Sequence, residues 1–556
     1  MSQGNGKDKA LARAETVRSI LRLPAKKKLD ALTEAPNSKE IIRAMPAADL
    51  YYALQEVGLA DYPEIVQLAS PAQFRTFIDL GAWTRDRIDP HQVLTWLRAA
   101  RGDDEADLYA KVDALDVEVL EFMLRAFTTV HDLEANPDVN PEGVTLETPE
   151  GKYLIELHVE GVELAALRQL IQDLIARNPL ETVRFLEATR WEVPTELEET
   201  AYRFRSARLE DLGFPPLEEA MALFAFRDPD KVGWTPPPAP ATNETALSTP
   251  SQRVDYLDAA LRDLSPQERE NFDQELRALA NAALVAEIQD PGDLDAVRRV
   301  GEMTRDYLSL GLEHLTRGAP QLAMECVRDL EARKIFQVGF SLTLKLKFRV
   351  DRIAREPLSR IGDVWLALRE EADALTALRR KRPLRALKVE GAEPVPFRSR
   401  RELEESSRII DRAIAQIALM RALLGGTGER AQAALATFGK PLEELGVEAV
   451  LAAAIAHAAA DGTPKVAPVP VPDLGRALAA LFRGTPDNPT VDPDTRERVM
   501  ELFTALVPEA QRADAAAAVN RVLERLREEV APGWLRDGRV DPAVAALVPT
   551  VGTKAP

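Results

Sequence analysis

Four side chains suited to binding an anion lie within seven residues of one predicted helix. They are Tyr202, Arg203, Arg205 and Arg208. The spacing places Arg208 on the apolar stripe of this helix, where an unpaired guanidinium would be costly to bury. It therefore needs a carboxylate or a phosphate as partner. We predict from these four residues a binding site for an anion or for an acidic partner.

The same charges also allow a purely internal interpretation. Arg208 could pair with Glu218 or Glu219, which follow it beyond a Gly-Phe-Pro-Pro corner. Arg203 lies four residues after Glu199, the spacing of an ion pair on a helix surface. Because helical charges commonly serve in such pairs, the sequence favours this alternative, and the binding site stays open beside it.

The helix that carries these residues has clear start and stop signals. Thr195, with Glu198 three residues later, forms a capping box that satisfies free N–H groups of the first turn. Gly213 and then Pro215 end the helix, because glycine adopts the left-handed conformation easily and proline cannot continue a helix. A second amphipathic helix is predicted from Leu217 onward.

No sequence motif for catalysis, metal binding or cofactor binding is present. The five histidines are too far apart for a compact metal-binding pair, and the chain has no P-loop, GxGxxG or GxSxG motif. Cys326, the only cysteine, lies in a helical pattern and is predicted to be a buried, inert thiol. We therefore predict no catalytic residue, no metal and no cofactor, although carboxylates brought together only by the fold are not excluded.

The most basic stretch of the chain, residues 379–401, begins with Arg-Arg-Lys-Arg. Such a stretch can contact nucleic acid or an acidic protein. It has only Phe397 as an aromatic residue. The chain as a whole has a net charge of −19, which disfavours a general affinity for polyanions. Nucleic acid is therefore a minor alternative.

Composition indicates a globular protein rather than a membrane protein. The chain has 556 residues, of which 46% are hydrophobic, enough for large cores. The N-terminus lacks the apolar core of a secretory signal. The longest uncharged apolar run, residues 450–460, is too short to span a bilayer. We expect a soluble, cytoplasmic protein without membrane insertion.

The fold class expected is predominantly all-α. Three similar segments, beginning near Pro46, Pro71 and Pro90, each place proline at the start of a short amphipathic helix. Such helices must stack to bury their apolar faces, which predicts an α-solenoid-like domain. Alternating apolar residues on both sides of a Pro-Glu-Gly turn predict one β-hairpin at about residues 144–160.

Composition shifts suggest five segments. They are a disordered tail (1–10), a helical-repeat domain with the hairpin (11–234), a proline-rich linker (235–250), a helical domain (251–425) and an alanine-rich helical region (426–556).

Two stretches resemble a known family. ELEETAYRFRSARLEDLGFPPLEEA, around the arginine helix, and LEHLTRGAPQLAMECVRDLEARKIFQVGFSL, at Leu312–Leu342, resemble the signature blocks of a bacterial family, domain-of-unknown-function family 6178. The similarity extends from about Leu50 to about Leu384 and implies no activity. The three proline-started repeats also loosely resemble the cytoplasmic helical-repeat domain of bacterial magnesium transporters, which implies a solenoid-like shape and no magnesium site.

Stacked amphipathic helices without a catalytic motif favour a helical scaffold or regulatory protein that holds a protein partner. Two alternatives remain open. One is an enzyme whose arginines and carboxylates, distant in sequence, act on an anionic small molecule. The other is nucleic-acid binding through residues 379–401.

Overall fold

A computed structural model describes residues 13–235, 255–389, 391–485, 488–533 and 540–551. The chain forms two compact units. Unit 1 comprises Met1–Phe224 with Asp273–Thr304, and unit 2 comprises Ala225–Phe272 with Arg305–Pro556. The tail predicted at residues 1–10 and nearly all of the linker predicted at 235–250 lie outside the described residues.

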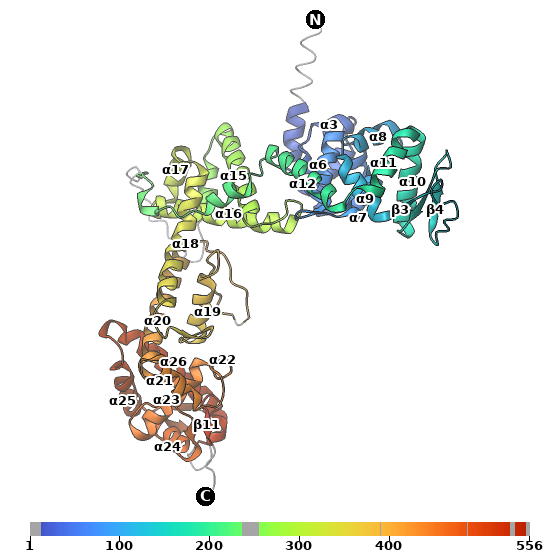
Figure 1. Ribbon diagram of the computed structural model, residues 1–556. Helices are drawn as coiled ribbons and strands as arrows, with labels where there is room; N and C mark the ends of the chain where they lie inside the picture. The colour runs from blue at the N-terminus through green and yellow to red at the C-terminus, as the bar shows by residue number, and fades with distance from the viewer. Residues whose placement is uncertain (1–12, 236–254, 390, 486–487, 534–539, 552–556) are drawn as a thin grey trace. The chain divides into compact units, whose positions relative to one another are not determined.

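Helices dominate unit 1 (Figure 1). Those that lie wholly in it are α2 (Ala25–Thr33), α3 (Ser38–Ala44), α4 (Ala47–Val57), α5 (Pro63–Leu68), α6 (Pro71–Gly81), α7 (Pro90–Ala100), α8 (Glu105–Asp113), α9 (Val117–Phe127), α10 (Gly161–Arg177), α11 (Pro179–Trp191), α12 (Pro194–Asp211) and α13 (Leu217–Met221). The residues of α15 (Pro266–Ala286) and α16 (Leu294–Leu315) are divided between the two units.

The three proline-started segments are helical, as predicted. They form α4, α6 and α7, and α6 begins with a complete capping box between Ser70 and Gln73. Their apolar faces meet around Trp96, whose ring packs against Tyr51 and Phe77 at centroid distances of 5.8 and 5.4 Å. The apolar spacing in the sequence therefore identified the core of this region correctly.

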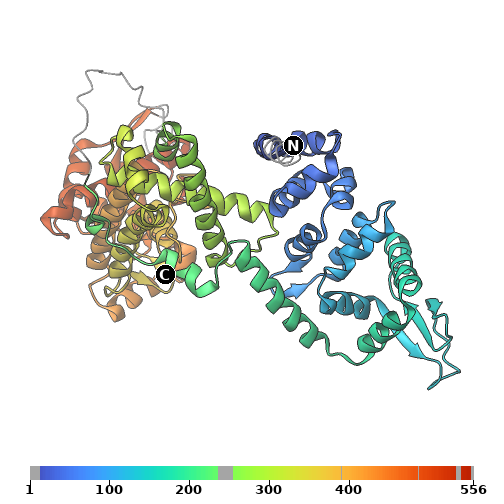
Figure 2. The ribbon, with the colours of Figure 1, turned by 90° about the horizontal axis from the view of Figure 1, so that it is seen from above.

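The predicted hairpin is present but belongs to a larger sheet. β4 (Val144–Glu147) and β5 (Tyr153–Leu157) are antiparallel, and β3 (Thr128–Asp132) pairs with the other edge of β5. The sheet lies beside α10 and α11 in both ribbon views (Figures 1 and 2). The prediction of a lone hairpin was thus incomplete. β3 directly continues α9, so the sequence offers no turn signal between the two elements.

Short strand pairs add to the helices elsewhere. They are β1 (Trp83–Thr84) with β2 (Arg87–Ile88), β6 (Arg360–Ile361) with β7 (Val364–Trp365), β8 (Val469–Pro470) with β11 (Thr550–Val551), and β9 (Phe482–Thr485) with β10 (Asn488–Val491).

Unit 2 is also built mainly of helices. They are α14 (Tyr256–Arg262), α17 (Ala323–Asp329), α18 (Ala332–Ala354), α19 (Arg369–Leu378), α20 (Arg400–Leu423), α21 (Gly428–Ala436), α22 (Leu442–Leu445), α23 (Val447–Asp461), α24 (Val471–Leu481), α25 (Pro493–Thr504) and α26 (Arg512–Val530). The run at 342–348, in which apolar and polar residues alternate as they would in a strand, lies inside α18.

A buried charge network ties three helices of unit 2 together. Glu371 on α19 is fully buried and accepts hydrogen bonds from Arg412 on α20 and Arg521 on α26, with N–O distances of 2.8 to 2.9 Å. Burial alone would raise the pKa of Glu371, but the Arg521 guanidinium, aided by Arg412, holds it below its usual value. A buried carboxylate needs such partners, because an uncompensated charge is expensive in the interior.

Two further sequence predictions are met by the structure. Cys326 is fully buried, and this burial raises the pKa of its thiol to about 12, so little thiolate forms at neutral pH. Within the described residues, no helix combines the length and apolarity needed to cross a membrane.

Candidate functional site

Arg205, one of the four predicted site residues, is almost fully buried inside unit 1. Its Nε donates to the carbonyl oxygen of Asp79 at 2.6 Å, and Nη1 donates to the carbonyl oxygen of Arg85 at 2.9 Å. Nη2 lies 3.5 Å from an oxygen of Asp290, and the guanidinium stacks over the ring of Trp83. Its hydrogen bonds and its cation–π contact all stay within this unit.

Arg208 joins α12 to two other parts of unit 1. Its Nε and Nη2 donate to both carboxylate oxygens of Asp79 on α6 at 2.7 Å. Nη1 and Nη2 also reach Asp116, the residue before α9, at 3.0 and 2.6 Å. Burial alone would lower the pKa of the Arg208 guanidinium, but its hydrogen bonds to the two aspartates raise this pKa above its usual value. The alternative prediction, that Arg208 forms an internal ion pair, is therefore correct. Its predicted partners, Glu218 and Glu219, are wrong, because the partners are Asp79 and Asp116.

The other two predicted residues lie toward solvent. Arg203 pairs with Glu199 on the helix surface, as the spacing predicted. Tyr202 is partly exposed, and its ring centroid lies 6.3 Å from that of Trp83. Thus Arg205 and Arg208 point into the unit and fix α12 to it. Arg203 lies on the helix surface and is not part of this inward-pointing pair.

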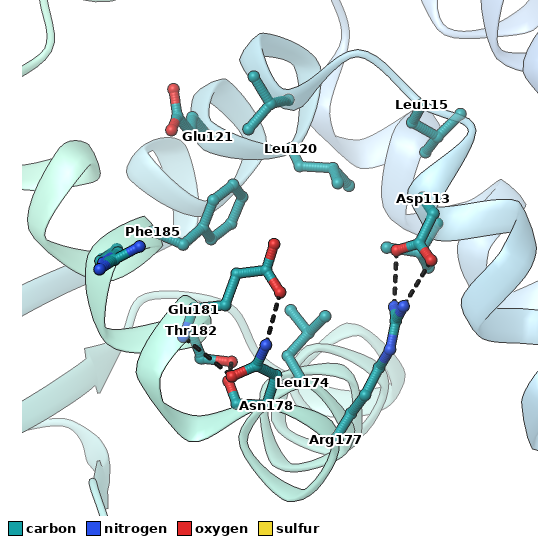
Figure 3. Close-up of a pocket in the computed structure, with 13 residues that line it drawn as sticks. Asp113, Leu115, Leu120, Glu121, Leu174, Arg177, Asn178, Glu181, Thr182 and Phe185 are labelled. Atoms are coloured by element: carbon teal, nitrogen blue, oxygen red, sulfur yellow. Dashed lines mark hydrogen bonds and ion pairs between the residues drawn. The ribbon is translucent and has the colours of Figure 1, made fainter.

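A cavity of about 570 Å³ opens to solvent beside α9 (Figure 3). It is lined by residues of α8, α9, α10, α11 and the loops that join them: Val112, Asp113, Leu115, Val117, Leu120, Glu121, Leu174, Arg177, Asn178, Glu181, Thr182, Arg184 and Phe185. Figure 3 shows Leu115, Leu120, Leu174 and Phe185 reaching toward the same space from different segments. We call this cavity the α9–α11 groove.

Polar groups at the groove are partly fixed by internal contacts. Arg177 and Asp113 form a bidentate ion pair with N–O distances of 2.6 and 2.5 Å, drawn on one side of Figure 3. Asn178 caps α11 by accepting from the N–H of Glu181, and its amide nitrogen donates to the Glu181 carboxylate at 2.8 Å. These bonds set the α10–α11 corner that forms one wall.

Glu121 differs from these groups because it is only 8% exposed and forms no hydrogen bond or ion pair with any described residue. Burial, followed by the nearby carboxylates of Glu192 and Glu118, raises the pKa of Glu121 to about 7. A carboxylate with a strongly shifted pKa and no hydrogen-bond or ion-pair partner, at the edge of a cavity, is the kind of group that marks a functional site.

Replacing Glu121 with glutamine should change how stability depends on pH. The folded pKa of about 7 lies above the ordinary value of 4.5, so the wild type loses stability as pH rises from about 4.5 to about 7. The Glu121→Gln variant lacks this loss. We expect it to gain about 3 kcal/mol relative to the wild type at pH 8 and less than about 1 kcal/mol at pH 5. Urea unfolding at both pH values measures the difference, and an equal gain at both would contradict the assignment.

The arginine helix and the groove are structurally connected. Asp116, a partner of Arg208, immediately precedes Val117, the first residue of α9. Arg208 therefore holds the beginning of the helix that forms one wall of the groove. This makes Arg208 a positioning residue for the groove.

The groove is not evident from the sequence. Its lining comes from segments separated by up to about 70 residues, and apolar residues at these positions look like ordinary core residues. One usable signal was the segment VEVLEFMLRAF, which is apolar on more than one helix face. Val117 is 48% exposed, so that helix has more apolar surface than its own core buries.

The basic stretch does not form a continuous cationic surface. Many of its arginines pair with nearby carboxylates: Arg379 with Asp351, Arg385 with Glu402, Arg398 with Asp306, Arg400 with Glu404 and Arg401 with Glu405. Across the described residues, no group of three or more histidine, cysteine, aspartate or glutamate side chains is arranged to hold a metal ion.

Comparison with curated proteins and with solved structures gives no match. A family model does match, over residues 5–550, which is far more than the resemblance from about Leu50 to about Leu384 indicated. Nothing supports the resemblance of the N-terminal repeats to magnesium transporters. Because the match covers almost the whole sequence, the chain belongs to the family of unknown function DUF6178.

Proposed function

We propose that the chain is a helical scaffold or regulatory protein that holds a segment of a protein partner in the α9–α11 groove. The observation that carries the proposal is an open cavity into which apolar side chains reach from several segments (Figure 3), with the unpartnered carboxylate of Glu121 at its edge. The occupant that fits is a peptide segment with apolar side chains and a lysine or arginine. Stacked helices, in a solenoid-like arrangement, present such grooves to partners.

Charge complementarity argues for a basic residue in the occupant. Glu121 has no internal partner, and the carboxylates of Glu118 and Glu192 add to the negative potential around it. Arg184 is the one lining cation without an ion pair among the described residues, whereas Arg177 is neutralised by Asp113. A cationic side chain beside Glu121 would relieve the repulsion among the carboxylates.

The apolar lining argues for a macromolecular segment. Val117 is about half exposed at the mouth, and Phe185 is also partly exposed. When a partner covers such residues, the binding free energy becomes more favourable by roughly 25 cal/mol per Å² of apolar surface removed from water.

The predicted arginine site takes part indirectly in this proposal. Arg205 and Arg208 keep α12 against α6 and α9, so they maintain the groove without contacting its occupant. Tyr202 and Arg203 stay on the outer side of α12, available to an acidic portion of the same partner.

A single substitution at the groove should abolish partner binding. Val117→Arg removes an apolar contact and places a positive charge where we expect a basic partner segment. Since Val117 is exposed at the start of α9, the fold should tolerate the change. In affinity purification of the tagged full chain from its native cells, a stoichiometric partner should accompany the wild type. The variant should recover it at least tenfold less well.

The matched control is Val162→Arg, which changes another exposed valine in the first turn of a helix of the same unit, outside the groove. It should retain the partner fully. Equal recovery with both variants would refute the assignment of the groove. Recovery of the wild-type chain without any partner would refute the scaffold function itself.

A further inference from the structure

Unit 2 contains a second cavity, of about 360 Å³, whose lining is rich in cationic side chains. It lies between α19, α20 and the segment 385–389. Its lining residues are Arg369, Glu370, Asp373, Ala374, Arg385, Ala386, Leu387, Lys388, Val389, Glu405, Ser406, Arg408, Ile409 and Arg412. We propose that this cavity binds a small molecule through a phosphate or carboxylate group.

The charges of the cavity do not balance internally. Five of the lining side chains are cationic and three are anionic. The three carboxylates already have partners: Glu370 pairs with Arg412, Asp373 with Arg369, and Glu405 with Arg401, which lies outside the lining. The excess positive charge is notable in a chain whose net charge is −19.

The uncompensated donors come from two different segments. Within the described part of the chain, neither Lys388 nor Arg408 forms an ion pair or a side-chain hydrogen bond. Arg385 pairs through Nη2 with Glu402 at 3.2 Å, but its Nε is buried and has no acceptor. A buried donor without an acceptor carries a desolvation cost that a ligand oxygen can remove.

The ligand class follows from the donors and from the remaining lining. Guanidinium groups match the geometry of phosphate and carboxylate oxygens, and hydrogen bonds between ionised groups are about twice as strong as neutral ones. Leu387, Val389 and Ile409 supply an apolar portion of the wall. A cavity of this size lies in the range that holds small molecules. A nucleic-acid strand would instead need a continuous cationic track, which the pairing of the neighbouring arginines removes.

The test uses the full chain, with inorganic phosphate and citrate as separate probes, in calorimetric titrations at constant ionic strength. The double variant K388Q/R408Q removes two exposed cations from the cavity. We expect it to weaken binding of at least one probe by about tenfold or more. The probe that binds the wild type more tightly identifies phosphate or carboxylate as the preferred group.

The control variant R380Q/K381Q removes the same charge from two exposed residues of the same stretch outside the cavity, and it should bind within twofold of the wild type. Equal weakening in both variants would reveal general electrostatic attraction and overturn the site. Absence of binding of both probes to the wild type would also overturn it. Binding of a single-stranded oligonucleotide to the wild-type chain would also overturn the site if R380Q/K381Q weakened that binding as much as K388Q/R408Q did.

Discussion

Replacing Gly311 with alanine is expected to lower the free energy of unfolding by about 3 kcal/mol or more. Gly311 on α16 and Gly339 on α18 lie where the two helix backbones cross in direct contact. A β-carbon on Gly311 would overlap the carbonyl oxygen of Ile335, and one on Gly339 would overlap that of Tyr307. Because backbone atoms cannot rotate away as a side chain can, the helices must separate. Urea unfolding of the full chain, followed by circular dichroism, measures the loss.

A control in the same helix separates this clash from the general effect of alanine. A β-carbon on Gly301 of α16 would meet no atom within 4 Å. Gly301→Ala should therefore stabilise the chain by up to about 1 kcal/mol, since alanine is the better helix former. If both variants changed stability in the same direction, the close crossing of α16 and α18 would be contradicted.

The second large effect is expected at Arg208. Arg208→Met keeps the approximate length of the side chain but leaves Asp79 and Asp116 without their shared cation. Removing one partner of a buried ion pair typically costs about 3 to 5 kcal/mol, because a buried charge remains uncompensated. The expected result is a corresponding decrease in unfolding free energy, together with faster amide exchange at the start of α9.

Two comparisons test the electrostatic origin of this effect. Arg203→Met, which breaks the exposed pair with Glu199 on the same helix, should cost less than about 0.5 kcal/mol. Adding Asp79→Asn and Asp116→Asn to Arg208→Met should restore part of the lost stability, because the stranded charges are gone. A triple variant less stable than Arg208→Met would mean that packing, not charge, explains the loss.

The sequence predicted local structure well because its signals are local. Proline at helix starts and glycine at Gly213 each act over a few residues, and the corresponding helices are present. The capping box predicted at Thr195 and Glu198 is wrong, because α12 already begins at Pro194 and no side-chain hydrogen bond caps its first turn. The buried face of β5 was likewise predictable, because alternate residues of a strand face opposite sides. The strand β3 was missed, since its pairing with β5 joins residues about 25 apart.

The contacts of the site could not be predicted in the same way. The sequence showed that Arg208 needs an anion, but Asp79 lies more than 120 residues away, and many other carboxylates are available. Residues 379–401 suggested a basic surface because the sequence does not show which carboxylates pair with them. Asp306 and Asp351 come from distant helices, and Glu402, Glu404 and Glu405 follow directly in α20. Periodicity identifies which residues are buried, and tertiary packing decides what they contact.

Hydrogen exchange of the full chain, with and without the partner purified from the native cells, tests the central claim most directly. If the partner lies in the α9–α11 groove, its binding should slow amide hydrogen exchange in α9 and in the first turns of α11. In the Val117→Arg variant, adding the partner should protect neither element. Partner-induced protection confined to other elements, with α9 and α11 unchanged, would contradict the proposal that the groove holds the partner.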